Sequence, residues 1–95
     1  VSATAETLMA STHFPAVRDT VMGRCAMCHT AEPTWEGLAF APKGVTLDAD
    51  AQIAEHAREI YLQAGRSHAM PPGNVSGMTE QERALLTAWF EEVRR

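Results

Sequence analysis

The chain has 95 residues, 45% of them hydrophobic, and a formal net charge of −4. This length allows one small domain, near the size at which a bound group or covalent staple helps the core. The acidic balance leaves no basic stripe for nucleic acid, and no apolar run approaches the roughly 18 residues of a membrane span.

The first twelve residues are mostly small or polar. The opening run, Val-Ser-Ala-Thr-Ala-Glu-Thr, lacks the basic start and the apolar stretch of a secretory signal. Such a composition is typical of a linker or tail. We therefore expect residues 1–12 to be a linker or disordered N-terminal segment, and residues 13–95 to form the domain.

A first helix is expected from Pro15 to the cysteines. Pro15 suits a first helical turn, and Val17, Val21 and Met22 then fall on one face. The helix leads directly into Cys25-Ala-Met-Cys28-His29, in which two thiols three residues apart are followed by an imidazole. This is the attachment pattern of a c-type haem. Cys25 and Cys28 would add to the haem vinyl groups, and His29 would bind the iron as proximal ligand.

Different sites built on two cysteines fit less well. A dithiol redox site should accompany a βαβ pattern, and no strand pattern of that kind is present. Zinc would need further histidines, none of which forms an HxxxH pair: His13, His29, His56 and His68. A disulfide or a coincidental match is still possible. Because haem is attached to CxxCH outside the bacterial inner membrane, we expect an exported, periplasmic chain that is a mature fragment or an excised domain.

The segment from Thr30 to Leu47 is expected to be a loop around the haem edge, because proline and glycine break any period. Its punctuating residues are Pro33, Gly37, Pro42 and Gly44. A carbonyl at Pro42, thirteen residues after His29, could accept the proximal imidazole N–H and fix its tautomer. Equally, Pro42 could only end a turn.

A second helix is expected between a cap at Asp48 or Asp50 and a stop at Gly65. Its apolar positions recur at three and four residues: Ile53, Ala57, Ile60, Tyr61 and Ala64. His56 falls on the polar side, and we expect it to lie on the surface.

The next loop, Arg66 to Met78, carries the expected sixth ligand of the iron. Met70 precedes Pro71-Pro72, which cannot continue a helix and fix an extended backbone, so a stiff loop could hold its sulfur toward the iron. Met78 stands beside the next helix and fits a packing role more simply. His68 could also bind the iron, or the sixth position could stay open.

The third helix begins with the capping box Thr79-Glu80-Gln81-Glu82. Its inner face holds Leu85, Leu86, Trp89, Phe90 and Val93. We expect this face to pack on Val17 and Val21 of the first helix. The pattern predicts an all-α domain of three main helices.

The haem propionates would need polar partners. Lys43, Arg58 and Arg66 are candidates, although each could equally be a solvated surface charge. Trp35 and Tyr61 could donate hydrogen bonds, but aromatic residues in a small domain are core by default.

Residues 14–93 resemble class I cytochrome c, in the order of CxxCH at Cys25–His29, Met70-Pro71-Pro72 and a last helix with Trp89-Phe90. The resemblance implies a small all-α fold around one covalently attached haem c, His29 and Met70 as axial ligands, and an exposed haem edge. The chain departs from the family in its longer stretch between Met70 and the last helix.

A narrower resemblance concerns the run from Met70 to Arg83, with Trp89 after it. This run looks like the cytochrome c domain at the C terminus of bacterial integral-membrane urate oxidases. The resemblance implies that electrons pass from urate, oxidised elsewhere in a fused membrane protein, through the haem to a respiratory-chain acceptor. No residue of this chain marks a urate site.

Three functions therefore stand side by side. The first is electron transfer, in which the domain is not itself an enzyme and meets a redox partner through a weakly polar patch. That patch would comprise Ala26, Met27, Ala69, Pro71 and Pro72. The second is a gas or small-ligand sensor, or a peroxidase-like domain, with a displaceable sixth ligand. The third is a passive subunit in which the haem is structural.

Overall fold

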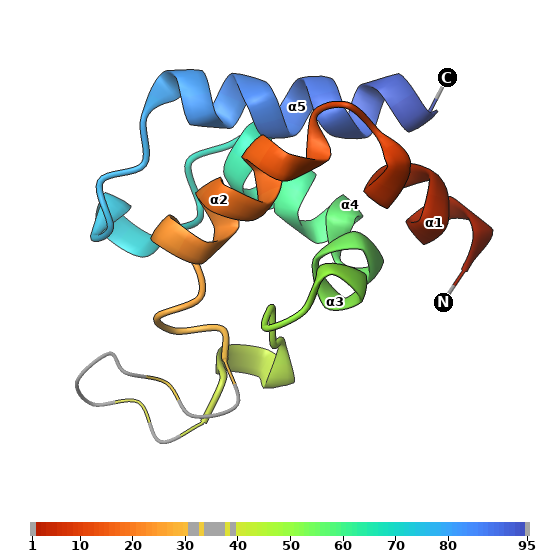
Figure 1. The fold of residues 1–95 in the computed structure, drawn as a ribbon. Coiled ribbons are helices and arrows are strands. Elements are labelled where there is room, and N and C mark those ends of the chain that lie inside the picture. The colour runs from red at the N-terminus through yellow and green to blue at the C-terminus, as the bar shows by residue number, and fades with distance from the viewer. Residues whose placement is uncertain (1, 31–32, 34–37, 39, 95) are drawn as a thin grey trace.

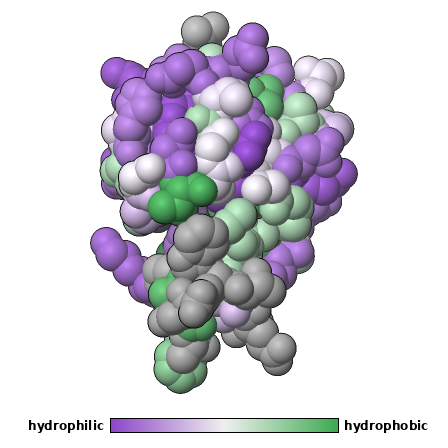
Figure 2. Space-filling view, turned by 90° about the vertical axis from the view of Figure 1, so that its left-hand side faces the viewer, coloured by the Kyte–Doolittle hydropathy of each residue, from purple (hydrophilic) through white to green (hydrophobic). Residues whose placement is uncertain are grey.

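The computed structural model describes residues 2–30, 33, 38 and 40–94. All regular secondary structure in these ranges is helical, so the prediction of an all-α chain is confirmed. No helix within the described ranges is long and apolar enough to cross a membrane. Hydrophilic side chains cover much of the face shown in Figure 2.

Two helices form the centre of the molecule: α2 (Phe14–Arg24) and α5 (Glu80–Arg94). α5 runs along the top of the view in Figure 1, and α2 passes beneath it. The predicted capping box is present, since the Thr79 amide donates to Glu82 Oε1 at 2.8 Å and the Glu82 amide donates to Thr79 Oγ1 at 3.1 Å. Both helices therefore begin where the sequence predicts, within a residue or two.

The predicted contact between these helices is the main core of the domain. Val17, Val21, Leu86 and Trp89 are fully buried in one cluster. The Phe14 and Trp89 rings also meet there, with centroids 5.9 Å apart. Phe90 takes a different partner, because its ring stacks on that of Tyr61 with centroids 4.6 Å apart.

The expectation of a linker over residues 1–12 is wrong, because helix α1 (Ala3–Ala10) forms there. Ser2 caps it by accepting a hydrogen bond from the Ala5 amide at 3.0 Å. Ala5 and Leu8 are buried, and the Leu8 carbonyl accepts from Trp89 Nε1 at 3.0 Å. Alanine favours helix strongly, so two buried positions on one face are enough to dock this short helix on α5 and on α3 (Asp50–Glu55).

The predicted second helix is divided into α3 (Asp50–Glu55), α4 (Ala57–Ile60) and a π-helical turn, η2 (Tyr61–Gly65). The first break falls at His56, whose φ of −98° and ψ of 15° are not helical. The π turn is closed by a 2.7 Å hydrogen bond from the Arg66 amide to the Tyr61 carbonyl, five residues back. Residues 50–65 therefore do not form one continuous α-helix.

Close packing of η2 on α5 depends on Gly65. A Cβ at this position would lie 2.9 Å from Thr87 Oγ1 and 3.3 Å from the Thr87 amide nitrogen. The absence of a side chain thus lets the two backbones approach closely enough to hold η2 against the core.

Candidate functional site

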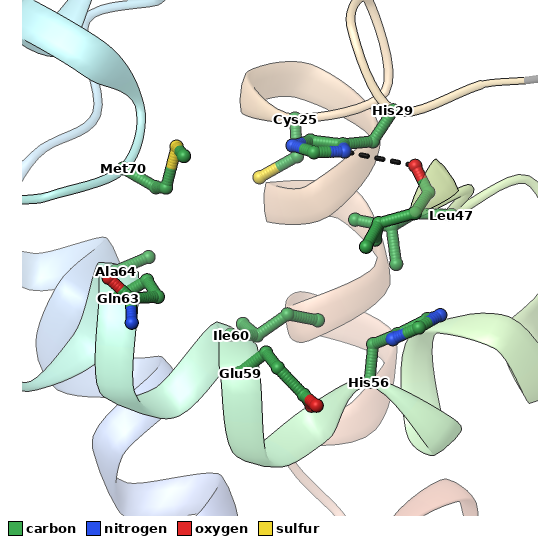
Figure 3. A pocket seen from close by; sticks show the side chains of 10 residues that line it. Cys25, His29, Leu47, His56, Glu59, Ile60, Gln63, Ala64 and Met70 are labelled. Carbon is green, nitrogen blue, oxygen red and sulfur yellow. Dashed lines mark hydrogen bonds between the residues drawn. The ribbon is translucent and has the colours of Figure 1, made fainter. Parts of the chain in front are cut away.

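A cavity of about 80 Å³ opens between the end of α2, the α4–η2 segment and residues 45–47. Figure 3 shows the side chains that line it. They are Cys25, His29, Val45, Leu47, His56, Glu59, Ile60, Gln63, Ala64 and Met70. The fold therefore brings His29 and Met70, far apart in sequence, to one cavity beside Cys25.

His29 is held by backbone contacts on two sides. Its amide donates to the Cys25 carbonyl at 3.0 Å, in a turn that continues from the end of α2. Its ring Nδ1 lies 3.0 Å from the Val45 carbonyl, which can only accept, so Nδ1 carries the proton. A neutral imidazole protonated at Nδ1 leaves the Nε2 lone pair for a metal ion.

The carbonyl partner of His29 is therefore that of Val45, and the prediction of Pro42 is wrong. Pro42 lies in the short 3₁₀ turn η1 (Pro42–Gly44), in which Lys43 and Gly44 have φ values of 56° and 69°. Beyond this turn the chain runs past His29, and the Leu47 amide donates to the His29 carbonyl at 2.7 Å.

Both cysteines are free thiols, and Cys25 faces the cavity while Cys28 lines a smaller hollow beside it. Burial raises the pKa of the Cys25 thiol to about 11, and the neighbouring Cys28 adds to the shift. Dithiol redox sites show the opposite, a lowered thiol pKa. The described residues contain no group of three or more His, Cys, Asp or Glu side chains that could hold a metal ion.

Met70 approaches the cavity from the loop between η2 and α5 (Figure 3). It is half-buried, and its amide donates to the Gln63 carbonyl at 2.8 Å. Pro71 has the expected extended backbone, with φ −65° and ψ 147°, and leads into the 3₁₀ turn η3 (Pro72–Asn74). The structure thus places the Met70 side chain in the same cavity as His29.

The remaining candidate sixth ligands lie elsewhere. Met78 is buried in the main core and does not line the cavity, in agreement with its predicted packing role. His68 has a side chain 69% exposed, with Nε2 2.7 Å from Glu80 Oε1. Neither residue is positioned to replace Met70.

Three residues with polar side chains border the cavity, although its lining surface is almost entirely apolar. His56 lies there with Glu59 and Gln63, so the expectation that it faces away on the surface is wrong. His56 stands four residues before Ile60, and that spacing places it on the cavity side of the helix. The four-residue spacing between His56 and Ile60 is a sequence signal from which the position of His56 beside the cavity could have been predicted.

Among the proposed propionate partners that the structure describes, none lines the cavity. Lys43 and Arg58 are exposed, and Arg66, 60% exposed, donates to the Tyr61 hydroxyl at 3.0 Å and lies 3.7 Å from Glu91. Tyr61 is buried, as expected of a core aromatic, and its hydroxyl donates to Glu91 at 2.7 Å. Trp35 lies outside the described residues.

Comparisons of the chain with protein-family models, curated protein sequences and solved structures find no match. Its function must therefore be inferred from the cavity and from the four side chains gathered around it, Cys25, Cys28, His29 and Met70.

Proposed function

We propose that the domain is a single-haem c-type cytochrome that transfers electrons. Cys25 and Cys28 would hold haem c through thioethers, with His29 and Met70 as the axial ligands. The observation that carries this proposal is that an imidazole protonated at Nδ1 and a thioether line one cavity beside a CxxC thiol. The bound haem would supply a one-electron iron couple.

The chemistry of the cavity suits such a group. Imidazole and thioether are established axial ligands of haem iron, and this pair raises the reduction potential relative to two histidines. The Val45 carbonyl would keep His29 oriented and basic. Leu47, Ile60 and Ala64 supply apolar walls that would keep water away from the iron and contact a largely apolar macrocycle.

The wider setting is part of the same proposal. The resemblance to class I cytochrome c, and to the haem domain of membrane urate oxidases, supports a domain on the periplasmic side of a bacterial inner membrane. Its electron donor would be a fused or separate oxidase domain, and its acceptor a respiratory-chain component. The domain itself makes and breaks no substrate bond, so it would not be an enzyme alone.

The experiment that tests the proposal is expression with a periplasmic haem-attachment system, followed by mass spectrometry and optical spectra. The expected product carries one haem through two thioethers and shows the weak near-infrared charge-transfer band of a methionine–iron bond. A product without covalent haem would rule out the proposed cofactor. Binding of carbon monoxide to the reduced protein at neutral pH would favour a ligand sensor or a peroxidase-like domain.

The sixth ligand is tested by two matched variants. We expect Met70→Ala to abolish the near-infrared band and lower the potential, because Met70 lines the cavity. We expect Met78→Ala to keep both, at a cost in stability, because Met78 is buried in the core. The reverse result would show that the assignment of Met70 is wrong.

A further inference from the structure

Arg83 is a buried cation that the proposed function has not used. It lies on the inner face of α5, three residues before Leu86, and is only 4% exposed. A buried guanidinium is stable only where several of its N–H groups find acceptors. The partners of Arg83 therefore show what its burial achieves.

The acceptors are backbone carbonyls around the loop that carries Met70. Arg83 Nη1 lies 2.8 Å from the Ala64 carbonyl, 2.8 Å from that of Met70 and 3.2 Å from that of Ser67. Nη1 has two hydrogens, so the two short contacts take direct donors and the longer one shares a hydrogen. Nε lies 3.8 Å from the exposed carboxylate of Glu80. The Arg83 guanidinium thus donates its hydrogen bonds to main-chain carbonyl oxygens.

These carbonyls connect the cavity wall to the ligand loop. Ala64 belongs to η2, where the final carbonyls of a helix lack helical partners and favour a cation. Met70 is also fixed from its other side, since its amide donates to the Gln63 carbonyl at 2.8 Å. Both backbone polar groups of Met70 are therefore bound to protein, one to η2 and one to α5. These two contacts fix the backbone of Met70.

We propose that Arg83 is the positioning residue for the sixth ligand, because it holds the Met70 backbone in place and would thereby keep the thioether at the iron of a bound haem. This inference rests on the proposed function. Hydrogen bonds from a charged donor are stronger than neutral ones, so the loop opens rarely. Rare opening would exclude external ligands from the iron of a bound haem, as an electron carrier requires.

The test compares Arg83→Lys with Arg18→Lys in the haem-loaded protein. Lysine keeps the charge but lacks the planar fork that spans several carbonyls. Arg18 is the matched control, because its Nε and Nη2 donate to Asp50 at 2.8 and 2.7 Å and join α2 to α3. We measure the rate of carbon monoxide binding to the reduced protein and the pH at which the near-infrared band is lost.

We expect Arg83→Lys to speed carbon monoxide binding about tenfold or more, a factor that corresponds to about 1.4 kcal/mol of loop opening. The band should be lost at a lower pH than in the parent protein. Arg18→Lys should change neither quantity, even if it lowers the melting temperature. Equal effects of the two variants, or no change for Arg83→Lys, would overturn the proposal and leave Arg83 a purely structural residue.

A second measurement covers the case in which Arg83→Lys does not fold. In the parent protein the Met70 amide should exchange its hydrogen slowly, because opening it requires the loop to leave Gln63 and Arg83 together. Exchange as fast as in an unstructured peptide would also overturn the proposal. Failure of the proposed function is recognised separately, by a parent protein without covalent haem or without the near-infrared band.

Discussion

Among single truncations of side chains on α5, Trp89→Ala should lower the free energy of unfolding the most. The side chain is fully buried, packs on the Phe14 ring and donates through Nε1 to the Leu8 carbonyl. Truncating a buried Trp to Ala costs about 3–5 kcal/mol, a large part of the roughly 5–15 kcal/mol that stabilises a small domain. Trp89→Ala therefore removes a large share of the stability. It abolishes both the packing of Trp89 in the core and its hydrogen bond to α1.

Trp89→Phe separates the two contributions. A Phe keeps an aromatic side chain against Phe14 but cannot donate to Leu8, and the lost hydrogen bond is worth about 1 kcal/mol beyond any change in packing. Denaturant unfolding followed by far-UV circular dichroism gives both values from the shift of the midpoint at constant slope. A loss below about 1 kcal/mol for Trp89→Ala would refute the buried position of this side chain.

Three further predictions concern separate parts of the molecule. Gly65→Ala should lower the melting temperature, because the new Cβ would meet Thr87 Oγ1, and adding Thr87→Ala should restore part of the loss. If the effects of the two substitutions on stability simply add, the contact is refuted. Burial alone would raise the pKa of Glu82, but hydrogen bonds from Thr79 and from Arg24 outweigh it and lower the pKa. Glu82→Gln should therefore destabilise the protein at pH 7, and the difference should vanish as the pH falls through the lowered pKa; a constant difference would refute the charge effect. Pro71 is buried and so does not belong to the expected docking patch. A charge placed at exposed Ala69 or half-buried Ala26 should slow electron exchange with a partner without changing the reduction potential. Unchanged stopped-flow rates would place the docking patch elsewhere.

The parts of the fold that were predictable are those with local causes. The limits of α2 and α5 follow from a proline, a capping box and a sustained apolar period, all within a few residues of the ends they determine. The CxxCH motif is equally local, because its spacing alone brings the thiols and His29 together. Nothing about the rest of the chain needs to be known to recognise it.

The missed features depend on the path of the chain through space. The partner of His29 is Val45 because the η1 turn decides which carbonyl passes the imidazole, and no spacing rule gives that. An arginine on a helix is ordinarily a surface charge, yet the position of Arg83 three residues before Leu86 places it on the buried stripe of α5. The short helix α1 shows little amphipathic pattern of its own and is stabilised by what it docks against.

The hydrogen bond between Trp89 and Leu8 joins positions 81 residues apart, so the core closes only when nearly the whole chain is present. During synthesis from the N-terminus to the C-terminus, α2 would emerge long before α5, its main partner, could cover it. Contacts of such high sequence separation form late and slowly. Cys25, which packs against the finished core, would stay accessible for that interval. The order of the elements therefore leaves the Cys25 thiol more accessible in the growing chain than in the folded domain.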